Sequence, residues 1–438
     1  MIIYVRKQAS IAVCVLLIAA VAGLFSSCER QHMDNRSANR ITDESSKTPD
    51  QTPVVGLSAT PEEEGPPQPP QESNPASGPT PIETPEPAEM PSLPPAPATS
   101  PTPSETPNPT PAPTPKPTQT PAPSPKPIAL SVVNPYVRYT WDQMMAETAK
   151  LQEKYPEWVS LASAGLSVEG RDLLLVKLGT GNKKIFLCGA HHAREYISSS
   201  YLMKMIETYA DYAAKDEKYG DYDVKALLEK VTIYIVPMVN PGGVNLVNNG
   251  LKAVNNQEAV EAMAMQRNSY REWKANIDGV DLNRQYPAYW EEKYDDVGVP
   301  ASENYKGAAS ATEPEVQAMI SLTEANDFIL SASFHTKGNL IYWADRGTVD
   351  LIPGVKDIAK RLGSLTGYDL MPVSEKPSVY GAGYENWFRL EFKRPSFCIE
   401  LTPSDNTDMP HNDKDFDSLV WKNAKYIGLL LADEAIKR

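Results

Sequence analysis

Hydrophobic residues in the last two thirds of the chain alternate between short β-branched runs and longer stretches with a helical period. The short runs predict strands over residues 173–178, 184–188, 231–237, 328–334, 340–343 and 396–401. The longer stretches predict helices over residues 141–155, 198–214, 313–324, 355–365 and 418–436. This alternation predicts an α/β fold in which helices cover both faces of one sheet.

The N-terminal third has a different composition. Residues 29–132 contain no aromatic residue and most of the chain's 41 prolines, many spaced as Pro-Thr-Pro or Pro-Ala-Pro. Such a segment cannot bury enough apolar surface to fold, so we expect a disordered, extended linker rich in Pro, Thr and Ser. The remaining residues, 133–438, are sufficient for a single α/β domain with a sizeable core.

Residues 1–28 have the features of a lipoprotein-type signal peptide. A positively charged start and an apolar run over residues 11–25 precede Ser-Ser-Cys28. The run is about 15 residues long, whereas a membrane span needs about 20. We expect Cys28 to carry a lipid anchor and the rest of the chain to lie at the extracellular face of a bacterial cell membrane or in the cell wall. Phe25 suits such a site less well than leucine, which leaves simple secretory cleavage or an uncleaved anchor open.

The most informative stretch is residues 189–197, where a predicted strand ends and a predicted helix begins. His192 and Glu195 stand three apart in the turn between them, and this spacing lets both side chains converge on one metal ion. Of the remaining histidines, His335 closes a predicted strand, and a ligand at a strand end is rigidly held. His335 is therefore the favoured third ligand.

His191 is an alternative ligand, four residues before Glu195, although a histidine beside a ligand is more often structural. A single His-x-x-Glu pair is also common by chance on solvated helix faces. The pair by itself leaves these interpretations open.

Three further motifs make the pattern more specific. After His192-Ala-Arg-Glu195 come Gly-Val-Asp-Leu-Asn283-Arg284, Ser-Phe-His335-Thr and Phe-Cys-Ile-Glu400-Leu, in that order. From about Tyr136 to the C-terminus, the chain thereby resembles the zinc carboxypeptidase family. The resemblance implies a mixed, mostly parallel eight-stranded sheet flanked by helices on both faces, with one Zn²⁺ at the carboxyl ends of the central strands.

The resemblance also implies roles for residues. His192, Glu195 and His335 would hold Zn²⁺, which would activate a water molecule and polarise the substrate carbonyl. Glu400 ends an apolar strand and would be the general base, with its pKa raised by partial desolvation. Asp281 would accept the other ring N–H of His192 and fix its tautomer.

Recognition of a free carboxylate falls, in this family, to the Asn-Arg pair, here Asn283 and Arg284. A guanidinium can bind a carboxylate through two parallel hydrogen bonds. Arg194 would help to steer the substrate inward. Without the motif, either arginine would be interpreted as a surface ion-pair residue.

Lys274 is a departure from the digestive-type members, which have an arginine that stabilises the oxyanion at this point. Lysine supplies the positive charge but not the planar fork of the guanidinium. The segment 273–287 is more similar to the bacterial branch that cuts γ-D-glutamyl-diamino acid bonds in peptidoglycan stem peptides.

Tyr380 and Glu385 lie in a predicted loop, residues 378–387, before the last strand. Tyr380 resembles the family's mobile tyrosine that closes over substrate, with glycines on its C-terminal side that would permit movement. Glu385 falls at the side-chain specificity position, where a carboxylate favours Lys, Arg or the amine of a diamino acid. A core tyrosine and a surface glutamate are equally compatible with the sequence.

Charge and cysteine content narrow the choice of partners. The net charge of −14 argues against binding to nucleic acid. Cys188 and Cys398 are expected to be core thiols, and the cysteine spacing suggests no metal cluster. The expected partners are a peptide or peptidoglycan stem-peptide substrate and, through the lipid anchor, a membrane; nothing in the sequence indicates an oligomer.

Together these features predict an extracellular zinc metallocarboxypeptidase that hydrolyses C-terminal peptide bonds, with Glu400 as general base. One alternative is a γ-D-glutamyl-diamino acid peptidase that acts on peptidoglycan stem peptides. A second alternative, which the Lys274 departure keeps open, is an inactive peptidase scaffold that serves as a cell-wall binding protein.

Overall fold

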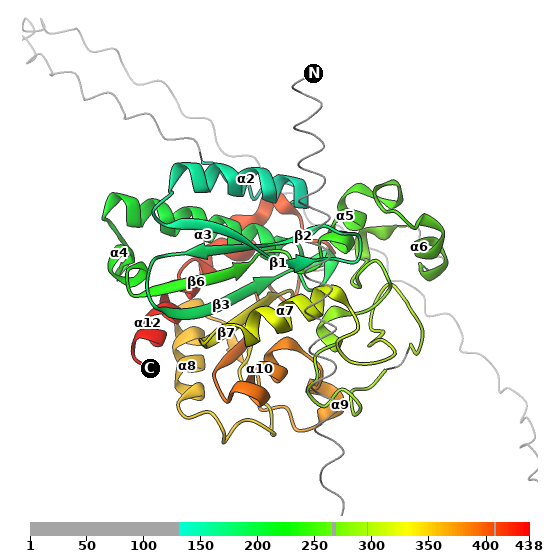
Figure 1. Cartoon of the computed structure of the whole chain (residues 1–438). Helices are drawn as coiled ribbons and strands as arrows, with labels where there is room; N and C mark the ends of the chain where they lie inside the picture. Colours follow the sequence, from blue (N-terminus) through cyan, green and yellow to red (C-terminus); the bar gives the residue numbers. More distant parts are fainter. Residues whose placement is uncertain (1–130, 265–268, 296, 407–408) are drawn as a thin grey trace, which may run out of the picture. The chain divides into compact units, whose positions relative to one another are not determined.

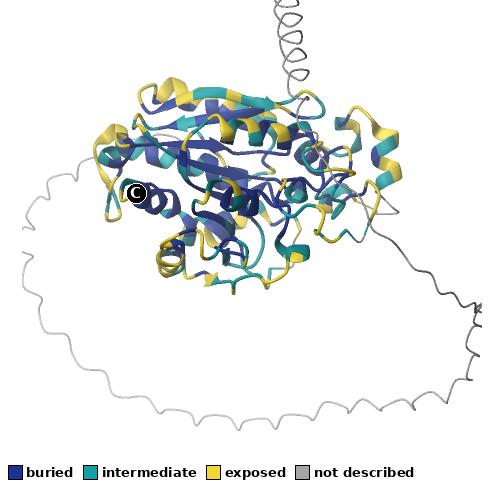
Figure 2. Ribbon diagram, turned by 60° about the horizontal axis from the view of Figure 1, so that its bottom comes forward, coloured by how far each residue is buried: buried dark blue, intermediate teal, exposed yellow. Residues whose placement is uncertain are grey.

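Alternate side chains of strand β3 (Lys183–Gly189) face two separate hydrophobic cores. Ile185 and Leu187 belong to the larger core, whereas Phe186 and Cys188 belong to the smaller one. Both faces of the strand are therefore buried, which explains its nearly unbroken apolar sequence. Figure 2 shows the central strands as a dark blue, buried layer inside a more exposed shell.

The computed structural model describes residues 131–264, 269–295, 297–406 and 409–438. The predicted signal peptide (1–28) and all but the last two residues of the predicted linker (29–132) lie outside the described residues, so both stay predictions. Within the described residues, no helix is both long enough and apolar enough to cross a membrane.

Eight strands form one sheet in the order β1–β2–β6–β3–β7–β10–β8–β9, of which β1, β2, β6, β3 and β7 are labelled in Figure 1. The four central strands are parallel to one another, and β2 and β8 run antiparallel to them on either side. The carboxyl ends of the parallel strands therefore meet at one edge, where α/β proteins usually bind ligands. The other strands are β1 (Val159–Leu166), β2 (Asp172–Leu178), β6 (Val231–Val236), β7 (Phe328–His335), β8 (Leu340–Tyr342), β9 (Asp369–Leu370) and β10 (Ser396–Glu400), with a separate hairpin of β4 (Lys218–Tyr219) and β5 (Tyr222–Asp223).

Helices cover both faces of the sheet, as predicted. Helices α2 (Trp141–Lys154), α3 (Ile197–Lys215) and α12 (Ile427–Ile436) pack on the larger core, and α7 (Pro314–Glu324) and α10 (Tyr384–Phe392) pack on the smaller one (Figure 1). The other α-helices of the described residues are α4 (Val224–Leu228), α5 (Pro241–Asn249), α6 (Gln257–Met263), α8 (Val355–Thr366), α9 (Pro377–Tyr380) and α11 (Lys422–Ala424).

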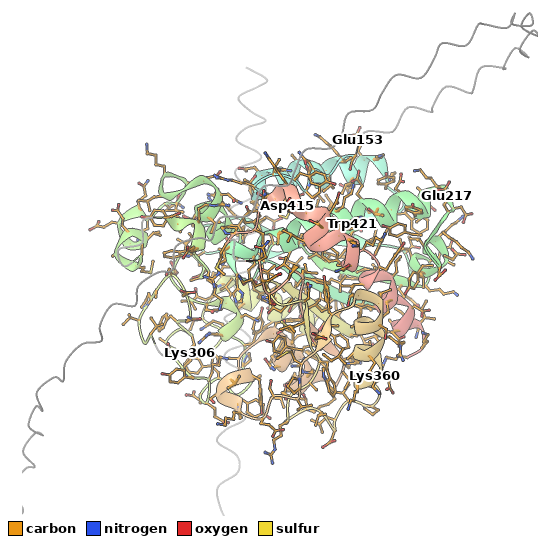
Figure 3. All side chains as sticks on the ribbon, turned by 180° about the vertical axis from the view of Figure 1, so that it is seen from behind. Glu153, Glu217, Lys306, Lys360, Asp415 and Trp421 are labelled. Carbon is orange, nitrogen blue, oxygen red and sulfur yellow. The ribbon has the colours of Figure 1, made fainter. Side chains whose placement is uncertain are left out.

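The C-terminal helix is shorter than predicted. A π-helical turn (Asp417–Trp421) and α11 come first, and α12 begins only at Ile427. Trp421, labelled in Figure 3, lies in the π-turn. The helical period of the sequence continues through both segments, so it does not reveal the interruption.

The prediction of a loop over residues 378–387 was wrong. The segment contains α9 and the first turns of α10, with only Gly381–Gly383 between them. Its glycines and its aromatic residues both disfavour a helical interpretation from local sequence. Packing of Tyr384, Trp387 and Phe388 into the smaller core stabilises α10 instead.

Candidate metal centre

The turn after β3 places His192 and Glu195 at the carboxyl edge of the sheet. The chain leaves β3 at Gly189 and makes a single 3₁₀ turn before α3. Because this turn is a single 3₁₀ turn, His192 and Glu195, three residues apart, have their side chains on the same side of it. The backbone N–H of Ala193 donates to the carbonyl oxygen of Lys274 at 3.0 Å and ties the turn to the segment around Lys274.

His192, Glu195 and His335 converge at this edge, and all three are buried. Glu195 Oε1 lies 2.9 Å from His192 Nδ1, and Oε2 lies 3.1 Å from His335 Nδ1. The two Nδ1 atoms are 3.2 Å apart. Two imidazoles and one carboxylate aimed at a common point form the donor set that holds Zn²⁺ in many hydrolases.

The charges of the cluster favour a cation at its centre. Burial opposes ionisation of Glu195, but His192 and His335 hold the pKa of this carboxyl well below its usual range. Burial also opposes the charge on His335, yet the carboxylates around it, chiefly Glu195, raise its pKa to about 9. A bound metal ion would supply the positive charge in place of the proton on His335, which must leave before that nitrogen can bind the metal.

The buried carboxylate of Asp281 contacts His192 on the side of the ring opposite to Glu195. Asp281 Oδ1 lies 3.1 Å from His192 Nε2, and Oδ2 lies 2.7 Å from Lys274 Nζ and 3.3 Å from Arg284 Nε. Burial opposes the charge, but Lys274, His192 and Arg284 together hold the pKa of Asp281 well below its usual range. The contact with Nε2 keeps Nδ1 turned toward Glu195, as expected for a residue that orients a metal ligand.

A second group of possible ligands shares His335. His335, Glu385 and Cys398 also offer ligand atoms within 4.8 Å of one another. Burial raises the pKa of the Cys398 thiol well above its usual range, and nearby carboxylates raise it further. Because a thiol must lose its proton to bind a metal, the group of His192, Glu195 and His335 is the better metal site.

Glu400 ends β10 directly beside His335, its partner in the parallel pairing with β7. Its Oε2 atom is buried and has no hydrogen-bond partner among the described residues. Burial raises the pKa of Glu400 to about 8, opposed by His335 and Lys274 and assisted by Glu195 and Glu385. A carboxyl group that exchanges its proton near neutral pH is suited to general acid–base work.

Glu400 lines a cavity of about 270 Å³ together with Asn283, Tyr380 and Glu385. Glu385 is 3% exposed, and its Oε1 atom has no hydrogen-bond partner within the described part of the chain. The distance from this oxygen to His335 Nε2 is 3.8 Å. The cavity thus presents a buried carboxylate to any ligand that enters it.

Tyr380 ends α9 at the cavity wall. Its ring packs edge to face against Tyr289, with ring centroids 5.6 Å apart, and burial raises its pKa to about 12. A Cβ atom at Gly381 would lie 2.9 Å from the carbonyl oxygen of Tyr289. Close approach of two backbones therefore accounts for this glycine.

The two arginines already have partners in the protein. Arg194 donates to Glu303 at 2.9 Å and to the carbonyl oxygen of Glu272 at 3.0 Å. Arg284 donates to Asn304 at 2.9 Å besides its contact with Asp281. Neither arginine lines the cavity. Their predicted substrate-binding roles stay predictions that require an exchange of partners.

His191 points away from the convergent group. Its Nε2 atom lies 2.9 Å from the hydroxyl oxygen of Tyr286, and the residue is fully buried. Burial and the two neighbouring histidines hold its pKa well below the usual range, so His191 is neutral. The structure therefore joins His192, and not His191, to Glu195 and His335.

Two cationic residues that sequence reasoning did not single out, Lys293 and Arg389, line the cavity. Arg389 lies on α10, four residues after Glu385, where a helical period would have placed it on the same face. Lys293 belongs to a polar segment without a motif, and only the tertiary structure brings it to the cavity.

Comparisons with known proteins show the family to which the chain is similar. Residues 144–425 match the family described as zinc carboxypeptidase. Gamma-D-glutamyl-L-diamino acid endopeptidase 1 of Lysinibacillus sphaericus is 33% identical over 304 residues, which cover 69% of this chain and 73% of that protein. Mast cell carboxypeptidase A of Homo sapiens is 27% identical over 234 residues, or 51% of each chain.

A solved structure has the same fold. Thrombin-activatable fibrinolysis inhibitor superposes with a TM-score of 0.56 at 18% identity, over 72% of this chain and 79% of that one. The resemblance found in the sequence and the predicted eight-stranded fold are thereby confirmed.

Proposed function

The chain belongs to the zinc carboxypeptidase family, and from this premise we propose that it hydrolyses the amide bond before a residue that carries a free carboxylate and a cationic side chain. The observation that carries the proposal is Glu385, a buried carboxylate in the cavity beside Glu400. An ammonium or guanidinium group would satisfy this carboxylate, whereas an apolar side chain would leave its Oε1 atom without a hydrogen bond, at a considerable cost.

The residues of the site divide the chemistry between them. His192, Glu195 and His335 fit Zn²⁺, which when bound polarises a carbonyl and makes water a stronger nucleophile. Glu400 accepts the proton of the attacking water and returns it to the leaving amine. Lys274 adds a positive charge behind His192 through its contact with Asp281.

Asn283 is the cavity residue placed to orient a substrate carboxylate. Its side-chain oxygen accepts a hydrogen bond from the backbone N–H of Tyr384 at 3.0 Å. This contact fixes the amide plane and points the NH₂ group toward the site, where it lies 3.5 Å from His335 Nε2. A preorganised donor loses little freedom when it binds an anion.

We propose that the released residue is a diamino acid and that the bond cleaved is the γ-D-glutamyl bond of a peptidoglycan stem peptide. Two features support this choice: the similarity to an endopeptidase named for that bond, and Lys274 in place of the arginine of digestive-type members. Removal of lysine or arginine from protein C-termini is the competing possibility.

The products of hydrolysis distinguish the stem-peptide enzyme from the ordinary carboxypeptidase. The full-length protein, loaded with zinc, is mixed with linear peptides and with muropeptides, and the products are identified by mass spectrometry. Cleavage of muropeptides before the diamino acid supports the proposal, and release of lysine or arginine from linear peptides favours the ordinary carboxypeptidase. No product from either mixture, with zinc bound, would favour an inactive scaffold that binds cell wall.

We further propose that the enzyme works outside the cell on a lipid anchor at Cys28, which the sequence pattern of residues 1–28 supports. Labelled fatty acid should be incorporated into the wild-type protein and not into the Cys28→Ser variant. Labelling of both proteins, or of neither, would contradict the anchor.

A further inference from the structure

Within the part of the chain that the structure describes, the cavity beside Glu400 contains one cation that has no charged partner. Of the two cationic residues that line it, Arg389 lies 3.1 Å from Asp345, and both of these residues are buried. Lys293 forms no ion pair with any carboxylate in the described part of the chain; its ammonium group donates only to the carbonyl oxygen of Val379. A partly buried ammonium group without a counter-ion is costly unless a ligand supplies one.

The position of Lys293 is built into the fold. Its backbone N–H donates to the carbonyl oxygen of Tyr289 at 3.1 Å, and its own carbonyl oxygen accepts from Lys306 Nζ at 2.8 Å. Lys306, labelled in Figure 3, also donates to the carbonyl oxygen of Trp290 at 3.1 Å. The side chain then reaches Val379 in α9, next to Tyr380. These contacts hold the ammonium group at the cavity wall.

The surroundings of Lys293 favour an anion. Burial lowers the pKa of its ammonium group to about 8, and the positive charges of Arg284 and Lys274 contribute, while Asp281 opposes them. Lys274 and Arg284 already contact Asp281, the carboxylate whose charge acts on Lys293, so Asp281 is not free to pair with Lys293. A negatively charged ligand in the cavity would supply Lys293 with a partner of its own.

We propose that Lys293 binds a carboxylate of the residue that the enzyme releases. The inference rests on the proposed function and adds to it a second charged contact. Lys293 and Glu385 line one cavity without forming an ion pair with each other. A residue that carries both a carboxylate and a distal ammonium group would satisfy the two charges at once, and this is the chemistry of a diamino acid.

Binding of free amino acids tests the inference without turnover. Calorimetry compares L-lysine, L-lysinamide and diaminopimelic acid as ligands of the full-length, zinc-loaded protein and of its Lys293→Gln and Lys293→Arg variants. Lys376→Gln is the matched control, because it removes an equal charge from an exposed residue beside α9.

Lys293→Gln should weaken the binding of lysine by about tenfold or more, as expected for loss of a charge-assisted hydrogen bond. It should leave the binding of lysinamide unchanged, and Lys293→Arg should restore part of the affinity. If the loss appears with diaminopimelic acid and not with lysine, Lys293 binds the distal carboxylate instead of the α-carboxylate.

An equal loss for all three ligands would mean that Lys293 only supports the cavity wall, and the inference would be overturned. It would also be overturned if Lys293→Gln bound every ligand as the wild-type protein does, or if the wild-type protein bound none of them. Binding with the expected pattern but without hydrolysis of any peptide would overturn the proposed function and leave the role of Lys293 intact.

Discussion

Glu400 stands opposite His335 in the parallel pairing of β10 with β7. One residue is a ligand of the candidate metal centre and the other is its candidate base, and they end neighbouring strands at the same height. Because the same residue pairing continues along both strands, the hydrogen bonds of the whole ladder together fix the distance between Glu400 and His335. Rigid strands thus position the two groups within the same site.

Replacement of Glu400 by glutamine should abolish turnover without loss of zinc. The amide is nearly isosteric but cannot accept a proton, and general bases contribute on the order of 10²- to 10⁴-fold to rate. Metal analysis and peptide hydrolysis of the same preparation would measure both quantities. Glu375→Gln, at an exposed residue, is the control. Undiminished turnover in Glu400→Gln would refute the assignment of the base.

The Asp281→Asn variant should bind zinc more weakly, by roughly 10- to 100-fold, because an asparagine no longer fixes the orientation of His192 with a negative charge. Competition with a chelator of known affinity measures this change. The exposed Asp278, three residues earlier, offers a matched Asp278→Asn control that should bind zinc as the wild type does. Equal zinc affinity in both variants would show that Asp281 does not support the metal site.

Selectivity for a cationic side chain should depend on Glu385. In Glu385→Gln, kcat/KM for substrates that release a cationic residue should fall by roughly 10- to 100-fold, the value of a charge-assisted contact. Substrates that release a neutral residue should lose less or gain. Parallel kinetics on the two substrate types give the ratio, and an unchanged ratio would remove Glu385 from the specificity site.

Stability should depend on pH through Glu315, a buried residue in the first turn of α7. Burial raises its pKa from 4.5 to about 7 in the folded protein. The folded state therefore holds the proton more tightly, and the wild-type protein loses stability as the pH rises from about 4.5 to about 7. Glu315→Gln cannot ionise and escapes this loss.

The advantage of Glu315→Gln should therefore be small near pH 4.5 and reach at most about 3 kcal/mol above pH 7. Denaturant unfolding at several pH values measures it. Glu324→Gln, at the exposed end of the same helix, should show no such trend. A stability difference that stays constant over this pH range would contradict the prediction.

The sequence was sufficient for the features that depend on local spacing. Apolar runs located six of the eight sheet strands. The spacing of three residues brings the side chains of His192 and Glu195 together because a single backbone turn joins the two residues. The end of an apolar run also located His335 and Glu400. The missed strands, β1 and β9, lie at the two edges of the sheet, where partial exposure weakens the apolar pattern.

Only the tertiary structure decided which distant residues share the site. The contact of Asp281 with Lys274, the turn of Arg194 toward Glu303, and the meeting of Lys293 with Glu385 in one cavity all join separate segments. Local sequence patterns report the period of a helix or a strand, whereas strand order and loop packing depend on the whole core. The sequence by itself therefore determined the kind of chemistry and most of the strands and helices of the fold. Packing determined which groups each charged residue contacts, because an unpaired charge becomes costly only when folding buries it.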